Sequence, residues 1–525
     1  MPKEIAVARV DDLSDGDMKE VEVEGLKILL TRLDGEFYAI GGECAHYGGP
    51  LAQGVLSGEH ITCPWHQARY LVKTGELVDP PALNSLARFE TKVERGKVFV
   101  ILPDNPSGTI PPAMVRRDDR ADSRVFVILG GGAAGNAAAQ KLRQLAFQGR
   151  IVLISQESRL PYDRPPLSKG YLSGDLDAEG LPLRSEDFYR EADIELLLGK
   201  HVSQVKPAIK TIIFTYGDSM TYDALLLATG SKPVELEVPG AGLNNVFTLR
   251  SAADCDQIIR AATQAAEAVV VGSSFIAMEA AASLRKRGLA VTVVGRSPVP
   301  FQRTLGPEIG GMLQKVHEEQ GVSFKLGRQV AALEGTTRVT AVVLDNGERL
   351  PADLVLVGLG VYPATDYLWD IPINPDHSVT VDRYLALADG LYAAGDIARF
   401  PDWRTGELIR VEHWQLAELH GFTAAANMAG QQKEFRGVPF FWTEHFDLYL
   451  YHVGHVTAWD EIIWHGKVQD RRFVAFYVKH GRVLAAAGCD YDHGLAYIAE
   501  LIRTDSLPTP AELRAGKTDL LAQLK

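Results

Sequence analysis

Residues 124–155 read RVFVILGGGAAGNAAAQKLRQLAFQGRIVLIS. An apolar run ends in a cluster of glycines, an alanine-rich segment follows, and a second apolar run closes the stretch. Apolar runs bounded in this way predict buried parallel strands, and the segment between them predicts a helix. Gly130, Gly132 and Gly135 have the spacing G-x-G-x-x-G, which in a strand–turn–helix context is typical of a dinucleotide-binding turn. The stretch therefore predicts a βαβ unit of a doubly wound α/β fold.

The same pattern returns at residues 267–295, EAVVVGSSFIAMEAAASLRKRGLAVTVVG, with Gly272 lying 142 residues after Gly130. This repeat predicts a second dinucleotide-binding domain. Ser274 and Ala277 stand where the first unit has glycines, and Ser274 leaves less room over a pyrophosphate. The alternative interpretation is a degenerate structural copy that binds no nucleotide.

Short strands with alternating apolar residues precede the first unit. The pattern is clear in VEVEGLKILLTRLDGEFYAIGG (21–42), around an Asp-Gly turn, and in KVERGKVFVIL (92–102). Residues 1–102 are therefore predicted to form an all-β domain. The next segment, 103–123, is rich in proline and charge without periodicity, which predicts a linker.

Composition and net charge limit the kinds of molecule that the protein is expected to bind and the places where it is expected to be found. The net charge is −13, which disfavours binding to nucleic acid or to an anionic membrane surface. No run of eighteen apolar residues and no leader peptide is visible, so a cytoplasmic protein without membrane attachment is expected. The chain has only four cysteines, and two of them stand alone in sequence, which argues against a disulfide framework.

The other two cysteines lie in CAHYGGPLAQGVLSGEHITCPWHQARY, residues 44–70, as Cys44-x-His46 and Cys63-x-x-His66. Four such ligands could hold zinc or an iron–sulfur cluster. Zinc motifs usually pair Cys with Cys and His with His, whereas here each loop supplies one of each. The arrangement favours a 2Fe–2S centre with the cysteines on one iron and the histidines on the other, and zinc is the alternative.

This stretch resembles the Rieske signature, including GGPLAQG after the first pair and CPWH at the second. The resemblance implies a Rieske-type 2Fe–2S cluster in the first domain. Respiratory Rieske proteins carry an additional cysteine in each loop, and this sequence has none there. The site therefore resembles the low-potential ferredoxin type, in which neutral imidazole ligands still raise the potential above that of all-cysteine ferredoxins.

The remainder resembles the FAD-dependent pyridine-nucleotide oxidoreductases of the ferredoxin-reductase and apoptosis-inducing-factor branch. The segments that carry this resemblance are LPYDRPPLSKGYL (160–172), ALLLATGSKP (224–233), ADLVLVGLGVYPAT (352–365), LYAAGDIARF (391–400) and RVEHWQLAELHGFTAAANMAG (410–430). The resemblance implies FAD, with NADH or NADPH as electron donor. It also implies a multi-domain chain, divided into a Rieske domain (1–102), a linker (103–123), an FAD-binding domain in two parts (124–247 and 366–432), an NAD(P)-binding domain (248–365) and a C-terminal α+β domain (433–525).

Site residues follow from the same resemblance. Residues expected to contact FAD are Arg164, Lys169, Val202, Thr229, Gly230 and Asp396, and Gly360 is expected beside the nicotinamide half. The acid expected to bind the adenosine ribose is displaced, and either Gln156 or Glu157 could take its place, with Glu157 preferred. Lys169 and Glu279 match an ion pair beside the flavin, Phe275 matches an aromatic that flanks the nicotinamide, and Trp414 lies in a stretch expected near the isoalloxazine ring.

The function expected from these features is electron transfer from NAD(P)H through FAD and the Rieske cluster to an external acceptor, such as an oxygenase component or a cytochrome. No C-x-x-C pair occurs, so disulfide reduction is excluded. The alternative is a redox-sensing or interaction flavoprotein that resembles apoptosis-inducing factor, and a homodimer is among the expected assemblies. At the end of the second strand of the second unit, Gly295 stands where an acid would favour NADH, and Arg296 directly after it favours NADPH.

Overall fold

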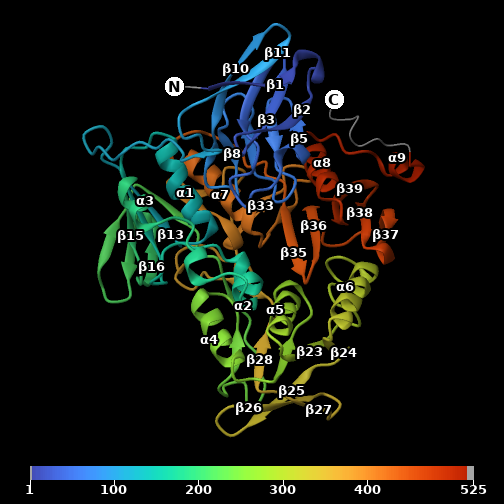
Figure 1. Ribbon diagram of the computed structural model, residues 1–525. Helices are drawn as coiled ribbons and strands as arrows, with labels where there is room; N and C mark the ends of the chain where they lie inside the picture. The colour runs from blue at the N-terminus through green and yellow to red at the C-terminus, as the bar shows by residue number, and fades with distance from the viewer. Residues whose placement is uncertain (1–2, 517–525) are drawn as a thin grey trace.

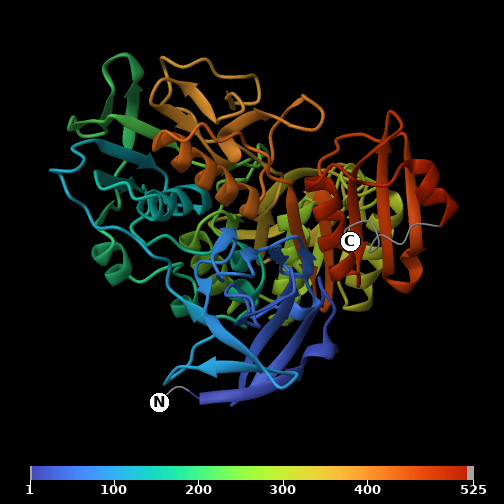
Figure 2. The ribbon, with the colours of Figure 1, turned by 90° about the horizontal axis from the view of Figure 1, so that it is seen from above.

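The protein is described by a computed structural model over residues 3–516 (Figure 1, Figure 2). The outermost parts of two predicted domains, residues 1–2 and 517–525, lie outside the described residues. The predicted fold class is confirmed, because antiparallel sheets flank two mainly parallel ones. In Figure 1 the N-terminal strands lie at the top, the second α/β fold at the bottom and the C-terminal sheet at the right. The domain boundaries themselves stay predictions.

The N-terminal domain consists of two antiparallel sheets. Its larger sheet has the order β1-β11-β10-β4-β3-β2, with the strands β1 Lys3–Arg9, β2 Met18–Val23, β3 Leu26–Leu33, β4 Glu36–Gly41, β10 Arg88–Glu94 and β11 Lys97–Leu102. Its smaller sheet has the order β5-β6-β7-β8, with the strands β5 Val55–Ser57, β6 His60–Thr62, β7 Arg69–Leu71 and β8 Leu77–Asp79. The predicted Asp34-Gly35 turn joins β3 to β4 with both residues at positive φ, as a two-residue hairpin requires.

The segment predicted as a linker is attached to both of its neighbours by backbone hydrogen bonds. Its strand β12 (Thr109–Ile110) pairs with β9 (Ser85–Leu86) of the N-terminal domain. Further along, the backbone N–H of Val115 donates to Arg143 in the first α/β fold, at 3.2 Å. The segment therefore runs along the surface of both domains, which composition alone did not indicate.

The first α/β fold is built on the sheet β15-β14-β13-β19-β32-β31. Its strands are β13 Val125–Leu129, β14 Arg150–Ile154, β15 Ile194–Leu197, β19 Ala224–Leu227, β31 Ala386–Ala388 and β32 Leu391–Ala393, and only β31 runs antiparallel to its neighbour. The helices of this fold are α1 Ala133–Gln144, α2 Gly170–Ser173, α3 Glu186–Glu191 and α7 Trp414–Met428. Because β32 joins the sheet beside β19, the chain returns to this fold after building the second one.

The second α/β fold has the parallel sheet β21-β28-β22-β23-β24. Its strands are β21 Val246–Thr248, β22 Glu267–Val271, β23 Ala290–Gly295, β24 Ser323–Leu326 and β28 Leu354–Val357, and its helices are α4 Ala252–Ala262, α5 Phe275–Lys286 and α6 Pro307–Glu319. Each α/β fold also carries a three-stranded antiparallel sheet, composed of β16 Val202–Lys206, β17 Thr211–Phe214 and β18 Ser219–Thr221 in the first and of β25 Val330–Gly335, β26 Val339–Leu344 and β27 Arg349–Pro351 in the second. Strands β20 (Ser231–Pro233) and β29 (Val361–Pro363) pair where the chain passes between the folds.

The C-terminal part is an antiparallel sheet covered by helices. The sheet order is β35-β36-β39-β38-β37, with the strands β35 Phe440–His445, β36 Leu448–Gly454, β37 Glu461–Lys467, β38 Arg472–Lys479 and β39 Arg482–Cys489, and the helices are α8 Asp492–Arg503 and α9 Pro510–Ala515. A further small sheet, composed of β30 Val379–Thr380, β33 Ala398–Pro401 and β34 Leu408–Ile409, precedes α7.

The N-terminal domain packs on the remainder of the chain above α7, β35 and α8 (Figure 1). Arg184 donates to Asn84 at 2.7 Å, and Arg69 pairs with Glu500 of α8 at 3.5 Å. These contacts place the small sheet β5–β8 against α8 of the C-terminal part, and the loop after β8 against the first α/β fold. Within residues 3–516, no helix is long and apolar enough to span a membrane.

Candidate functional site

A cavity of about 980 Å³ lies where the two α/β folds meet α7 and the C-terminal strand β35. It is lined by most of the predicted site residues, namely Gly130, Gly132, Gln156, Glu157, Arg164, Lys169, Val202, Thr229, Gly230, Ser274, Phe275, Glu279, Gly360, Asp396 and Trp414. Among the residues predicted for the flavin and nicotinamide sites, Gly135, Gly272, Ala277 and Arg296 do not line it, and neither do the predicted cluster ligands Cys44, His46, Cys63 and His66. We call this space the large cavity.

The first glycine turn forms one end of the large cavity. Gly130 has φ 122°, and a Cβ there would lie 2.0 Å from the carbonyl oxygen of Ala228, so only glycine fits. Gly135 is needed for close packing of α1 on the turn, because a Cβ at this position would lie 1.8 Å from the carbonyl oxygen of Gly130. Helix α1 begins at Ala133 with no side-chain cap, and its first turn lines the cavity. Its free N–H groups suit the pyrophosphate of a dinucleotide such as FAD.

The second turn repeats this backbone with different side chains. Gly272 has φ 124°, and its Cβ would lie 2.2 Å from the carbonyl oxygen of Gly358. Ala277 takes the place of the third glycine. Its methyl group fits because the residue opposite is Gly358, where a Cβ would lie only 2.8 Å from that of Ala277. Ser274 caps α5 without a side-chain hydrogen bond and is exposed to the large cavity. The second turn therefore still presents the uncapped N-terminus of α5 to the large cavity.

The two candidates for the ribose acid differ in their partners. Glu157 accepts hydrogen bonds from Arg164 at 2.5 Å and from the hydroxyl of Tyr162 at 2.7 Å, one on each carboxylate oxygen. Gln156 is exposed at the end of β14. Glu157 is therefore held in one orientation toward the large cavity, whereas Gln156 is not held by any hydrogen bond to the described residues.

Asp396 is fixed by residues that the sequence interpretation missed. Its Oδ2 atom accepts hydrogen bonds from the hydroxyl of Ser231 at 2.6 Å and from Nη2 of Arg250 at 3.0 Å. The backbone oxygen of Arg250 in turn accepts from Arg164 at 2.9 Å, so both arginines belong to one network. A signal for Arg250 was present, because it directly precedes the capping box of α4 at the end of a strand.

The predicted ion pair is present beside the large cavity. Nζ of Lys169 lies 2.7 Å from Oε2 of Glu279, whose side chain is 3% exposed. The Glu279 carboxylate also accepts hydrogen bonds from Ser168 at 2.5 Å and from Thr443 at 2.7 Å. A carboxylate buried to this degree is tolerated only when each oxygen is satisfied, as here.

The aromatic residues predicted near the flavin and nicotinamide line the same space. The ring of Phe275 packs at 4.7 Å from that of Phe441, and Trp414 opens helix α7 at the cavity wall. His413, beside Trp414, has a buried Nδ1 atom without a hydrogen-bond partner in the described chain, and burial lowers its pKa well below the usual value. An orphaned polar atom in the wall of a cavity this size fits a resident polar cofactor.

The two predicted cysteine ligands are buried in loops of the N-terminal domain, with Cys44 after β4 and Cys63 directly after β6. Neither Cys44 nor Cys63 forms a disulfide, and the thiols share a hydrogen bond that lowers the pKa of Cys44 and raises that of Cys63. The hydroxyl of Tyr70 accepts from the backbone of Ala45 at 3.1 Å, which leaves its proton for Cys44 Sγ at 3.3 Å. A Cβ on Gly49 would lie 2.7 Å from Cys63 Sγ, so glycine is required over the sulfur.

The two histidines face each other across the same site. Nδ1 of His46 lies 3.1 Å from Nδ1 of His66, a separation that fits two nitrogen ligands bound at about 2.1 Å to one metal ion. Burial lowers the pKa of His46 to about 4 and that of His66 well below its usual range, so both imidazoles are neutral. Two neutral imidazoles and two thiols on facing loops fit the Rieske-type cluster.

The histidine side of this site meets the large cavity. The ring of His66 lies 4.3 Å from that of Trp442 in β35, and Trp442 lines the large cavity. Tyr47 stacks on His46 at 3.9 Å and donates a hydrogen bond to Asp163 of the first α/β fold. The sequence interpretation missed Trp442 and Tyr47, because their importance depends on how the domains pack.

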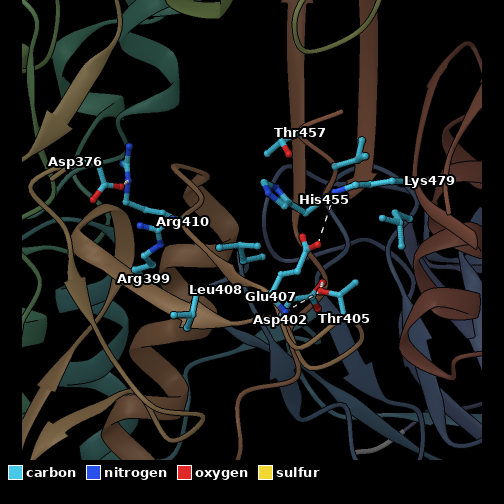
Figure 3. A pocket seen from close by; sticks show the side chains of 13 residues that line it. Asp376, Arg399, Asp402, Thr405, Glu407, Leu408, Arg410, His455, Thr457 and Lys479 are labelled. Atoms are coloured by element: carbon cyan, nitrogen blue, oxygen red, sulfur yellow. Dashed lines mark hydrogen bonds and ion pairs between the residues drawn. The ribbon is translucent and has the colours of Figure 1, made fainter. Parts of the chain in front are cut away.

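A second, smaller cavity of about 310 Å³ lies between β33–β34 and the C-terminal sheet (Figure 3). Its lining is charged but balanced, with Asp376, Arg399 and Arg410 on one side and Glu407 and Lys479 on the other. No predicted site residue lines it. The chemistry inferred from the sequence therefore gathers in the large cavity.

Comparisons with known proteins agree with this arrangement. Residues 124–421 match the family described as pyridine nucleotide-disulphide oxidoreductase, residues 3–90 match the Rieske 2Fe–2S domain, and residues 440–524 match the reductase C-terminal family.

Individual relatives cover different shares of the chain. Apoptosis-inducing factor 3 of Homo sapiens is 38% identical over 95% of this chain and 84% of its own. The ferredoxin reductase subunit of 5,5'-dehydrodivanillate O-demethylase from a Sphingobium species is 36% identical over 72% of this chain and 94% of its own. The crystal structure of a covalent putidaredoxin reductase–putidaredoxin complex aligns with a TM-score of 0.73 and 31% identity, over 76% of this chain and 98% of the other.

Proposed function

The chain belongs to the pyridine nucleotide-disulphide oxidoreductase family and carries a Rieske domain at its N-terminus, and on that premise we propose that it passes electrons from NAD(P)H to its own Rieske centre and then to an external one-electron acceptor. It is an oxidoreductase that uses FAD, NAD(P)H and a 2Fe–2S cluster. When bound, FAD takes an electron pair from the nicotinamide and releases electrons singly to a one-electron centre. We propose both the route that the electrons take within the chain and the kind of protein that accepts them.

The observation that carries the proposal is the contact between His66 and Trp442. Their ring centroids lie 4.3 Å apart, and Trp442 forms part of the large-cavity wall that also includes Trp414 and Phe441. Electron transfer weakens steeply with distance, so a histidine ligand in contact with the cavity wall favours transfer inside one chain. The Rieske centre then takes the place that a separate ferredoxin would occupy.

Three side chains hold the N-terminal domain and the flavin-binding part of the chain in this position. Nε2 of Gln415, in the first turn of α7, donates to the carbonyl oxygen of Pro80 at 3.1 Å. Tyr47 donates to Asp163, and Arg184 donates to Asn84 at 2.7 Å. Because hydrogen bonds are directional, these contacts fix the orientation in which the two sides meet.

On the flavin side, the Lys169–Glu279 pair supplies charge. A lysine in the cavity wall stabilises negative charge that develops when a cofactor there is reduced, and the Glu279 carboxylate 2.7 Å away fixes the position of the lysine. Side chains of Phe275 and Phe441 exclude water from the same wall. These residues suit hydride transfer in a dry site.

For the acceptor, we propose a protein with a one-electron centre, such as an oxygenase component or a cytochrome. Support comes from the Sphingobium relative, whose name describes a ferredoxin reductase subunit of an O-demethylase. A second candidate function is a redox-sensing flavoprotein with slow NAD(P)H oxidation. It is favoured by the 38% identity with apoptosis-inducing factor 3 over 95% of this chain, N-terminal domain included.

Rapid mixing with NAD(P)H under anaerobic conditions tests the proposal. The spectral bands of flavin and Rieske centre are followed separately in wild type, in Trp442→Leu and in Trp464→Leu, a control in β37 whose side chain does not line the large cavity. We expect Trp442→Leu to slow Rieske reduction at least about tenfold while flavin reduction stays fast, a loss of about 1.4 kcal/mol in transition-state stabilisation. Equal Rieske rates in all three proteins would contradict the route, and a reduced flavin that persists for minutes with NAD(P)⁺ bound would favour the sensor.

A further inference from the structure

Two buried histidines form a chain of hydrogen bonds that ends at the Lys169–Glu279 pair. His317 lies in the last turn of α6 and His445 at the end of β35, and neither is exposed. Nε2 of His317 lies 3.1 Å from Nδ1 of His445, and Nε2 of His445 lies 3.1 Å from the hydroxyl oxygen of Thr443. That hydroxyl donates to Oε1 of Glu279 at 2.7 Å. The chain therefore crosses from α6 to the wall of the large cavity.

The position of each proton in this chain follows from its partners. Glu279 receives donors on both oxygens, from Thr443 on one and from Lys169 and Ser168 on the other, so it acts as an acceptor. The hydroxyl of Thr443 has given its only proton to Glu279, and it must accept from Nε2–H of His445. Both hydrogen bonds of the Thr443 side chain thus have a fixed direction.

The same reasoning fixes both imidazole tautomers. Burial lowers the pKa of His445 to about 3 and that of His317 to about 2, so each ring is neutral and carries one proton. His445 keeps its proton on Nε2, and its Nδ1 must accept from Nε2–H of His317. Nδ1 of His317 is then a bare acceptor, and it is a buried atom without a hydrogen-bond partner in the described part of the chain. Every donor in the chain points toward Glu279.

The surroundings contain few competing charges. Phe301 packs on His445 at 5.5 Å, and Phe324 and Phe446 pack on His317 at 6.2 and 5.1 Å. Glu444, next to His445 in β35, pairs with Lys286 at 3.7 Å. The chain is therefore insulated along its length.

We propose that these side chains form a proton path that protonates Glu279 when negative charge appears beside Lys169. A solvent proton binds Nδ1 of His317, whose Nε2 proton passes to Nδ1 of His445. The Nε2 proton of His445 passes to the oxygen of Thr443, whose own proton passes to Oε1 of Glu279. Both histidines end neutral in the opposite tautomer, no electron moves, and Glu279 gains one proton.

The consequence is electrostatic. Once Glu279 is neutral, the charge of Lys169 is no longer offset and can stabilise a negative charge in the large cavity. Hydride transfer to a bound flavin creates such a charge, so this inference rests on the flavin site of the proposed function. The far end lies in the last turn of α6, where His317 is buried and the next residues, Glu318 and Glu319, are exposed.

The matched variant is His445→Gln. A glutamine amide can donate to Thr443 and accept from His317, which preserves the hydrogen bonds, yet it cannot take up and release a proton as imidazole does. His465→Gln serves as the control, because His465 lies in the same sheet with its Nε2 atom 3.0 Å from the backbone oxygen of Leu513 and outside the chain. His445 is a positioning and relay residue and does not line the large cavity.

The test is flash photoreduction of the flavin in the full-length holoprotein, with the rate of proton uptake followed by a pH-indicator dye. We expect His445→Gln to slow this uptake at least about tenfold and His465→Gln to match wild type. Nitrogen NMR of the histidines should show Nε2–H tautomers at positions 317 and 445 in the oxidised protein. An unchanged rate of proton uptake in His445→Gln, or an Nδ1–H tautomer at His445, would overturn the proposal. Photoreduction needs neither NAD(P)H nor the Rieske centre, so failure of the proposed electron route gives a different result.

Discussion

Two histidine pairs in this protein have the same nitrogen–nitrogen separation and different surroundings. His46 and His66 face each other at 3.1 Å between nitrogen atoms, and so do His317 and His445. All four rings are neutral because burial lowers each pKa. The first pair faces two buried thiols, whereas the second faces a threonine, a carboxylate and phenylalanine rings. A close pair of neutral imidazoles therefore specifies no function by itself, and the third partner decides whether it binds metal or transfers protons.

The largest expected effect comes from removing the partner that makes the first pair a metal site. Wild type should contain iron and acid-labile sulfide at about 2:2 per chain. Cys63→Ser should lose both, because a 2Fe–2S cluster needs its thiolates, whereas His445→Gln should retain them. His66→Cys should keep iron and lower the midpoint potential, since a thiolate replaces a neutral ligand. Metal and sulfide analysis with potentiometry checks this, and stoichiometric zinc in place of iron would contradict the Rieske assignment.

A smaller effect is expected at Glu279, the carboxylate at which the hydrogen bonds from His317 and His445 end, and at its partner Lys169. Lys169→Ala should slow flavin reduction because the positive charge is lost, and Glu279→Ala should slow it because Lys169 loses the hydrogen-bond partner that holds it in place. FAD should stay bound in both variants. The double variant should be no slower than the worse single variant, because the two side chains lie 2.7 Å apart and act as one unit. Stopped-flow reduction rates give the coupling, expected to exceed about 1 kcal/mol. Additive losses would mean that the two residues act separately.

Much of this arrangement could be predicted from local sequence. Gly130 and Gly272 indicate strand–turn–helix units, because their turns need a positive φ and leave no room for a Cβ. Cys44 and Cys63 are recognisable because a metal site needs particular atoms at short spacings. Lys169 and Glu279 lie 110 residues apart in sequence, and only the family resemblance brought them together before the structure did.

Other features depend on packing between domains, which no local pattern encodes. Trp442 gains its role from contact with His66, and the two residues come from opposite ends of the chain. Arg250 meets Asp396 only because the chain returns to the first α/β fold after the second. His317 and His445 look like ordinary core histidines in sequence, and their significance depends on the direction of four consecutive hydrogen bonds.

The smallest expected effect concerns a residue that belongs to neither pair. Arg296 is exposed after β23 and does not line the large cavity, yet no acid stands at that position to favour NADH. We expect NADPH to be used at least as well as NADH, and Arg296→Ala to lower kcat/KM for NADPH by about tenfold, or about 1.4 kcal/mol, with little change for NADH. A tenfold preference of wild type for NADH that Arg296→Ala leaves unchanged would show that this arginine does not read the 2′-phosphate.

The central claim is that electrons reach the Rieske centre inside one chain, through the contact between His66 and Trp442. The most direct measurement is the rate of Rieske reduction after anaerobic mixing with NAD(P)H at a series of protein concentrations. Transfer within a chain predicts the same rate across a tenfold dilution, because donor and acceptor share one polypeptide. A rate that falls in proportion to dilution, or a centre that stays oxidised until a separate ferredoxin is added, would contradict the claim.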